Sequence, residues 1–205
     1  MLTPYQLTPL EQWIETLYKE LNIVTPDQLH IHELAAKFNI WVYYMDMKSM
    51  VVERQGLFSV NIDRRLSSKE QWEEFLHELC HVLRHSGNQT SMPMPFLDWQ
   101  EQDAANFQLY AAIPFSMVSR LHLPERQIHA TQLLVEEFHV THKLAATRLE
   151  QIQRRVWQGI LDQEYRAQLE KQTSKYNPAN WSDETRYIMD RLQQQIDRKG
   201  ASSNG

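Results

Sequence analysis

The sequence predicts an α+β protein that is mostly helical, with a small β-sheet beside its helices. Most apolar residues recur at helical spacing, in segments that begin with capping residues. Two short segments are instead rich in aromatic and β-branched residues, as strands are. Only 5 of the 205 residues are glycine, which favours helices over turn-rich all-β folds. The length suits one domain with a helical appendage.

The first predicted helix begins after Thr8 and extends to about residue 21. Thr8 is a suitable N-cap, Pro9 occupies the first helical position, and Glu11 completes a capping box. A short second helix fits residues 31–38, where apolar residues again recur at helical spacing. These signals place two helices before the first strand.

The two predicted strands cover residues 40–45 and 56–62. In the second strand Ser59 and Asn61 form a polar row that alternates with apolar residues. An extended peptide can bind to a protein by adding to an exposed sheet edge. We expect 56–62 to be an edge strand, with Ser59 and Asn61 as candidate contacts for such a peptide; an interior or solvent-facing strand is the alternative.

The next predicted helix begins after Ser67 and contains the sequence HELCH, residues 77–81. His77 and His81 lie one turn apart, so both imidazoles can reach one Zn²⁺ ion. Glu78 lies between them, where it can accept a proton from a metal-bound water. The pattern predicts a zinc site with Glu78 as catalytic base. The alternative is an amphipathic helix whose histidines only face water.

A third protein ligand must come from elsewhere. His85 would lie about 12 Å from His77 along a straight helix, too far to share the ion. A loop at 87–98, which contains Gly, Asn and two prolines, is predicted to end this helix. The following predicted helix, 98–112, offers Asp98, Glu101 and Asp103 as carboxylate ligands. Cys80 falls toward the buried side of its helix, so we expect a small core residue in preference to a redox sensor or fourth ligand.

The remainder of the chain is predicted to be helical. We expect the whole chain to have three parts: a domain at 1–125, a helix-turn-helix-like segment at 126–160, and a polar tail at 161–205. The tail includes a last helix at 181–196 and a frayed end. In the second segment Thr141 would cap a helix presenting His142, Lys143 and Arg148, which could read DNA. The net charge of -5 disfavours direct DNA binding. The preferred interpretation is a helical hairpin that packs under the metal site or grips the substrate.

Composition also bounds the cellular setting. Cys80 is the single cysteine, so no intramolecular disulfide can form, and the N-terminus does not resemble a signal peptide. No apolar run approaches the roughly 20 residues of a membrane span. We expect the protein in the reducing cytoplasm, without membrane contact.

The chain resembles the ImmA/IrrE family of bacterial and phage metallopeptidases in three segments. These are HELCHVLRH, EQDAANFQLYAAIP and LLVEEFHVTHKLAATRL. The resemblance covers about residues 29–150. It implies a zincin-like core, a Zn²⁺ cofactor, zinc-binding His77 and His81, a catalytic Glu78, and Glu101 as the third ligand.

The resemblance also implies a function. Similar proteins are anti-repressors that cleave, or otherwise inactivate, a helix-turn-helix (Xre-like) repressor of a phage or mobile element. We therefore expect a zinc endopeptidase, with a non-catalytic, zinc-containing anti-repressor as the alternative. Ala105 stands where the family usually has Asp or Asn, so a hydrogen bond that orients a ligand is in question. Helical spacing points Asp103 and Asn106 away from the face of Glu101.

The group that would stabilise the developing oxyanion is left open by the sequence. It should be a Tyr, His or Arg that faces the metal. The candidates are Tyr43, Tyr44, Tyr110, His122, His139 and His142.

Overall fold

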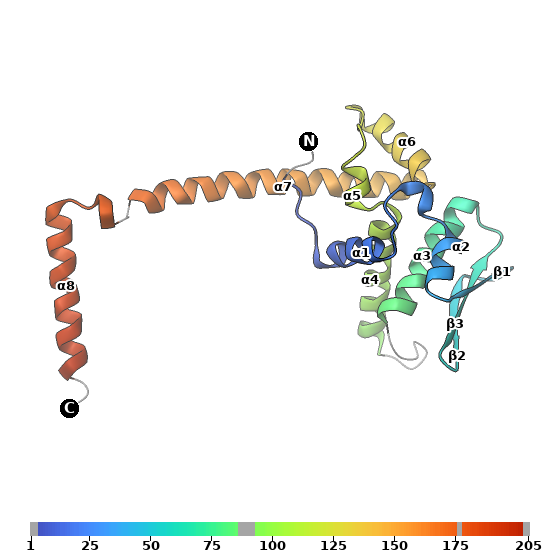
Figure 1. Cartoon of the computed structure of the whole chain (residues 1–205), viewed down its shortest axis with the longest axis horizontal. Coiled ribbons are helices and arrows are strands. Elements are labelled where there is room, and N and C mark those ends of the chain that lie inside the picture. The colour runs from blue at the N-terminus through green and yellow to red at the C-terminus, as the bar shows by residue number, and fades with distance from the viewer. Residues whose placement is uncertain (1–3, 86–92, 176–177, 203–205) are drawn as a thin grey trace. The chain divides into compact units, whose positions relative to one another are not determined.

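A computed structural model describes residues 4–85, 93–175 and 178–202. It confirms a mostly helical α+β chain with a small sheet (Figure 1). The helices are α1 (Pro9–Glu20), α2 (Ile31–Lys37), α3 (Ser68–Arg84), α4 (Met94–Ala112), α5 (Phe115–Val118), α6 (Gln127–Glu137), α7 (His142–Lys175) and α8 (Asp183–Ser202), with 3-10 turns η1 (Pro26–Gln28) and η3 (Pro178–Asn180). The strands are β1 (Trp41–Met45), β2 (Met50–Arg54) and β3 (Leu57–Asp63).

The predicted capping boxes start α1 and α3. The Thr8 hydroxyl accepts a hydrogen bond from the Glu11 N–H, and the Glu11 carboxylate accepts one from the Thr8 N–H. Ser67 and Glu70 make the same reciprocal pair before α3. Both boxes satisfy backbone donors that a helix start leaves without intrahelical partners.

The sheet order is β1-β3-β2, with β1 parallel and β2 antiparallel to the central strand β3. Our expectation that 56–62 forms a sheet edge is therefore wrong. The strand that it pairs with, β2, had not been predicted. Gln55 and Gly56 join β2 to β3 with φ of 56° and 78°, the left-handed conformation of a tight hairpin turn.

The polar row on β3 also points the wrong way for a substrate site beside α3. Val60 and Ile62 are fully buried among the helices. Side chains alternate between the two faces of a strand, so Ser59 and Asn61 lie on the opposite face of the sheet. Ser59 and Asn61 therefore lose the basis on which we assigned them to substrate binding.

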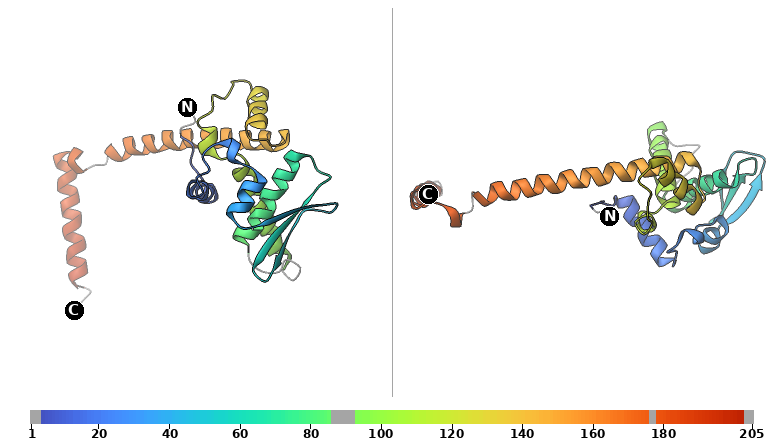
Figure 2. Two further views of the ribbon diagram at one scale, coloured as in Figure 1. Left: turned by 45° about the vertical axis from the view of Figure 1, so that its right-hand side comes forward. Right: turned by 90° about the horizontal axis from the view of Figure 1, so that it is seen from above.

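Helix α3 lies at the centre of the fold. It packs against β3 and β2 on one side and against α4 on the other, and α4 in turn contacts α1 (Figures 1 and 2). Phe75, Leu76 and Leu79 of α3 are fully buried. The face of α3 that carries the histidines is thereby fixed with respect to α4.

Helix α4 begins at Met94, four residues earlier than Asp98, where we expected it to start. We had assigned the prolines before Asp98 to a loop. Pro93 is the N-cap and Pro95 lies in the first turn, where a helix tolerates proline because those N–H groups have no intrahelical partner. Residues 87–92 of the predicted loop lie outside the described residues.

Buried residues of α6 and of the first turns of α7 belong to the hydrophobic core of the first unit. Thr141 caps α7 by accepting a hydrogen bond from the Leu144 N–H, and its own N–H donates to the Glu73 carboxylate of α3 at 2.6 Å. Arg148 is fully buried and forms an ion pair with Glu11. Arg148 therefore cannot contact DNA as the helix-turn-helix alternative required.

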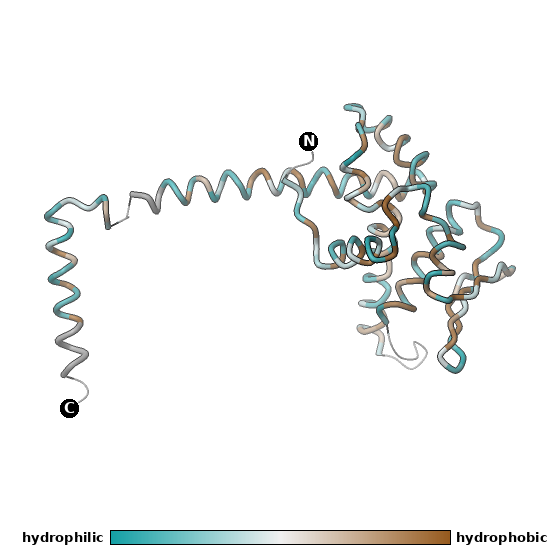
Figure 3. The backbone as a smooth tube through the Cα atoms, in the orientation of Figure 1, coloured by the Kyte–Doolittle hydropathy of each residue, from teal (hydrophilic) through white to brown (hydrophobic). Residues whose placement is uncertain are grey.

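Two compact units make up the chain, Met1–Val156 and Trp157–Gly205. Helix α7 continues through residue 160, and the expected boundaries at 125 and 160 stay predictions. The residues of the second unit are mainly hydrophilic (Figure 3). The Ser182 hydroxyl caps α8 by accepting a hydrogen bond from the Thr185 N–H. Helix α8 extends to Ser202, beyond the predicted end at 196; residues 203–205 of the expected frayed end lie outside the described residues. Among the described residues no helix is long and apolar enough to cross a membrane.

Candidate metal centre

Three metal-binding side chains from α3 and α4 converge on one point. The Nε2 atoms of His77 and His81 lie 3.2 Å apart. The Glu101 carboxylate approaches them from α4, with Oε2 3.2 Å from His77 Nε2 and Oε1 3.6 Å from His81 Nε2. The structure thus brings together the three residues that the sequence and the family resemblance suggested as ligands.

The arrangement fits a tetrahedral zinc ion with three protein ligands. Bonds of about 2.0–2.1 Å at tetrahedral angles place neighbouring donor atoms about 3.3 Å apart. The three distances found here lie close to that spacing. Two imidazoles and one carboxylate are also the donors of many catalytic zinc sites, in which the fourth position is left for water or substrate.

His81 is in the protonation state that metal binding needs. Burial, with a contribution from the neighbouring His77, lowers the pKa of His81 to about 4. Its imidazole is therefore neutral near pH 7, and a neutral imidazole offers a lone pair to a cation. A metal would not have to displace a proton from His81 at that pH.

Glu78 is positioned between the helix and the sheet. Only 8% of it is exposed, and the Val51 backbone of β2 lies close enough to its carboxylate to act on its pKa. Burial, with Glu74 adding to it, raises the pKa of Glu78 to about 7, although Val51 and Lys48 oppose the shift. A carboxylate with a pKa near the working pH is suited to proton transfer. The sequence did not indicate the contact with β2, because that strand was missed.

A second cluster adjoins the first. His85 Nδ1 lies 2.8 Å from His81 Nδ1, and His85 Nε2 lies 3.2 Å from Asp103 Oδ2. Helical spacing points Asp103 away from the face of Glu101, yet the structure links Asp103 to the metal centre through His85, the residue that follows α3. The Cys80 side chain is fully buried, as expected, 3.8 Å from Asp103.

The oxyanion-stabilising group stays a prediction for most candidates. Tyr110 is unsuited, because its hydroxyl accepts hydrogen bonds from Gln151 and Arg155 at the base of α7. Tyr43 shares the outward face of the sheet with Asn61, whereas Tyr44 has the opposite orientation and lies beside His32. No contact with the metal centre distinguishes His122, His139 or His142 among the described residues.

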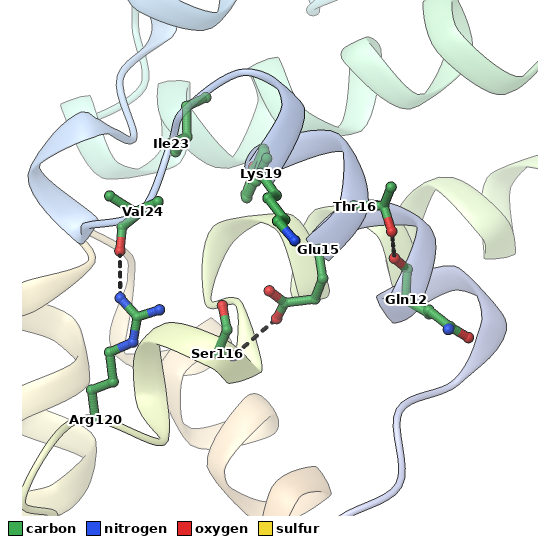
Figure 4. Close-up of a pocket in the computed structure, with 9 residues that line it drawn as sticks. Gln12, Glu15, Thr16, Lys19, Ile23, Val24, Ser116 and Arg120 are labelled. Atoms are coloured by element: carbon green, nitrogen blue, oxygen red, sulfur yellow. Dashed lines mark hydrogen bonds between the residues drawn. The ribbon is translucent and has the colours of Figure 1, made fainter.

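A cavity of about 390 Å³ lies elsewhere, between α1 and α5, and none of the three metal donors lines it (Figure 4). Polar groups on its walls bind one another. The Ser116 N–H donates to Glu15, and Arg120 donates to the Val24 carbonyl. We interpret it as a seam between packed elements, so the metal centre is the candidate functional site.

Known proteins match the part of the chain that carries these residues. The IrrE N-terminal-like domain of the peptidase M78 family matches residues 35–150, which include all three donors and Glu78. The chain belongs to this family. The IrrE-like chain is 36% identical over 149 residues to the phage-like element PBSX protein XkdA of Bacillus subtilis, covering 73% of this chain and 75% of XkdA. It is 31% identical over 159 residues to the uncharacterized protein YqaB of the same organism, covering 78% and 92%.

Proposed function

We propose that this IrrE-like protein is a zinc-dependent endopeptidase that cleaves a helix-turn-helix repressor of a phage or mobile element. One observation carries the proposal: the donor atoms of His77, His81 and Glu101 converge at zinc-ligand spacing, and Glu78 lies between the two histidines in the chain with its pKa near neutrality. Membership of a metallopeptidase-like family supports it.

The chemistry divides between the cofactor and Glu78. Bound Zn²⁺ would acidify water and polarise the scissile carbonyl. Glu78 would accept the proton of the attacking water and return it to the leaving amine. The buried setting of Glu78, next to the Val51 backbone, limits the positions that its carboxylate can take, which favours such a transfer.

Strand β2 is the better candidate for holding substrate. It pairs with β3 on one side, and it does not pair with another described strand on the other. An extended peptide can bind such an edge through backbone hydrogen bonds. Because Val51 of β2 contacts Glu78, a peptide added at this edge would lie beside the catalytic carboxylate.

The nature of the partner is part of this proposal. XkdA is named as a protein of a phage-like element, and the resemblance to the ImmA/IrrE family implies an action on repressors. We therefore propose that the substrate is the helix-turn-helix repressor encoded beside the gene for this chain. Its cleavage would release the element from repression.

The test is a cleavage assay with the purified, zinc-loaded protein and that repressor, followed by intact mass measurement. The wild-type protein should yield two fragments. Glu78→Gln should slow their appearance by roughly 100- to 10,000-fold, the usual contribution of acid-base catalysis, and should keep one zinc per chain. The exposed Glu33→Gln is the matched control and should cleave at the wild-type rate.

Two outcomes would contradict the proposal. Cleavage by Glu78→Gln at the wild-type rate would remove Glu78 from the mechanism. A repressor that leaves its operator without being cut, with wild-type and Glu78→Gln alike, would favour a non-catalytic anti-repressor that acts by association.

A further inference from the structure

Both ring nitrogens of His81 have neighbours in the structure. Nε2 faces the metal donors, whereas Nδ1 lies 2.8 Å from Nδ1 of His85. A neutral imidazole that binds a metal through Nε2 carries its proton on Nδ1. In a metal centre built on His81, its Nδ1–H must therefore be the donor and His85 Nδ1 the acceptor.

The same reasoning fixes the proton on His85. If His85 accepts at Nδ1, its own proton is on Nε2, which lies 3.2 Å from Asp103 Oδ2. An ionised carboxylate only accepts hydrogen bonds. The two contacts therefore form one directed chain, from His81 to His85 to Asp103, in which every donor meets an acceptor.

Asp103 is itself held in place. Arg84 donates to its two oxygens, from Nε at 2.8 Å and from the guanidinium nitrogen Nη2 at 3.3 Å. The Arg84 guanidinium lies over the Trp13 ring, 5.2 Å from its centroid. The His85 side chain is only 4% exposed, so water competes little for its hydrogen bonds.

We infer that His85 and Asp103 are positioning residues of the metal centre: they hold His81 in the tautomer, and at the ring angle, that present Nε2 to zinc. The inference rests on the proposed zinc site and deepens it. Ala105 stands where the family usually has Asp or Asn. Asp103, also on α4, can take over the role of that side chain, because it supports the ligand His81 through His85.

The same side chains could instead be regarded as a second metal site, because Cys80, His85 and Asp103 offer three donor atoms close together. The contacts argue against this. Asp103 is already engaged by the Arg84 cation, and His85 Nδ1 is engaged by His81. A cation placed there would compete with Arg84 for Asp103. Binding it through His85 Nε2 would also put the His85 proton on Nδ1, where it would face the Nδ1–H of His81.

The test compares four full-length proteins: wild type, His85→Ala, His85→Gln and His129→Ala. Zinc dissociation constants are measured by competition with a chelator. Loss of a partner that orients a ligand weakens metal binding by roughly 10- to 100-fold, and His85→Ala should show a loss of this size. His85→Gln should restore most of the affinity, because its amide can accept from His81 and donate to Asp103. His129 is an exposed residue of α6, and its replacement should change nothing.

A second readout separates positioning from a general structural role. Long-range ¹H–¹⁵N correlations of the metal-free proteins above pH 7 report which ring nitrogen carries the proton. Wild type should show His81 protonated at Nδ1 and His85 at Nε2, and His85→Ala should show His81 as a mixture of tautomers. The thermal midpoint of each metal-free variant establishes that it is folded.

The inference is overturned if His85→Ala binds zinc as tightly as wild type, if His81 is protonated at Nε2, or if wild type binds a second zinc that His85→Ala lacks. A wild-type protein that binds no zinc at all would refute the proposed function instead. In that case the tautomers of His81 and His85 alone decide whether the hydrogen-bonded chain exists.

Discussion

Glu101 is the donor that connects α4 to the two histidines of α3. Its side chain is 49% exposed, so it approaches the centre from the solvent side, whereas His81 is held from behind by His85. The three ligands therefore have unequal support. Glu101 is the ligand whose replacement should alter the centre with least disturbance of the core.

Glu101→Gln should lower the affinity for zinc by more than the roughly 100-fold that the loss of an orienting partner can cause, because it removes a charged ligand itself. Competition with a chelator measures the change. Asp98→Asn is the matched control, since Asp98 was an equal candidate in the sequence and lies outside the donor group. A larger loss for Asp98→Asn than for Glu101→Gln would place the third ligand elsewhere.

The sequence was informative about the site wherever a single helix determines geometry. His77 and His81 are one turn apart, so their convergence needs only helical spacing. The role of Asp103 needed the packing of α3 against α4, which no spacing within α4 contains. His85 and Asp103 are neighbours because the end of α3 packs against α4, so their contact appeared only in the structure.

A buried ion pair joins α1 to the N-terminal part of α7. Glu11 is 2% exposed and binds Arg148 at 2.9 Å, together with Arg155. Burial alone would raise the pKa of Glu11, but Arg148, the Thr8 N–H, Tyr5 and Arg155 together hold it below its ordinary value of 4.5. A depressed folded-state pKa adds stability above the ordinary value, and that stability is lost as the pH falls through the folded value.

Glu11→Gln should therefore be less stable than wild type near pH 7, by roughly 3–5 kcal/mol, because it leaves Arg148 buried without its counter-charge. The difference should shrink as the pH falls below 4.5, where wild type loses the same contribution. Urea unfolding at a series of pH values measures this. The exposed Glu20→Gln should show no such difference, and a gap for Glu11→Gln that stays constant down to pH 3 would contradict the argument.

Elements with strong terminal signals were predictable. Thr8 and Ser67 mark the starts of α1 and α3 because a cap satisfies local backbone donors. Strand β2 was missed although it adjoins β3 in the chain, and the sheet order was not predictable because β1 pairs with β3 across the intervening strand. The Gln55–Gly56 turn was the one local signal for a hairpin, and it lacks the Asn-Gly or Asp-Gly pair that usually marks one.

The molecule as a whole divides after Val156, beyond the contacts of Arg148 and Arg155 with Glu11. A chain that ends at residue 160 should keep its zinc affinity. Its thermal midpoint should shift by less than roughly 2–4 °C, which is the shift that a change of 1 kcal/mol in the free energy of unfolding produces in a protein of this size. Calorimetry and chelator competition measure both quantities.

The matched control is a chain that ends at residue 147, which removes Arg148 and Arg155 and leaves Glu11 buried without either cation. It should fail to fold cooperatively. Equal behaviour of the two truncated chains would show that the ion pairs at the base of α7 do not hold the first unit together.

The metal donors belong to two helices that follow one another in the chain, so a cation bound to all three would fasten α3 to α4 as a cross-link does. Closing a loop in this way disfavours the unfolded chain, and a ligand that binds only the folded state stabilises it by mass action. A zinc-bound protein should therefore resist unfolding and proteolysis at this helix pair more than the metal-free protein does.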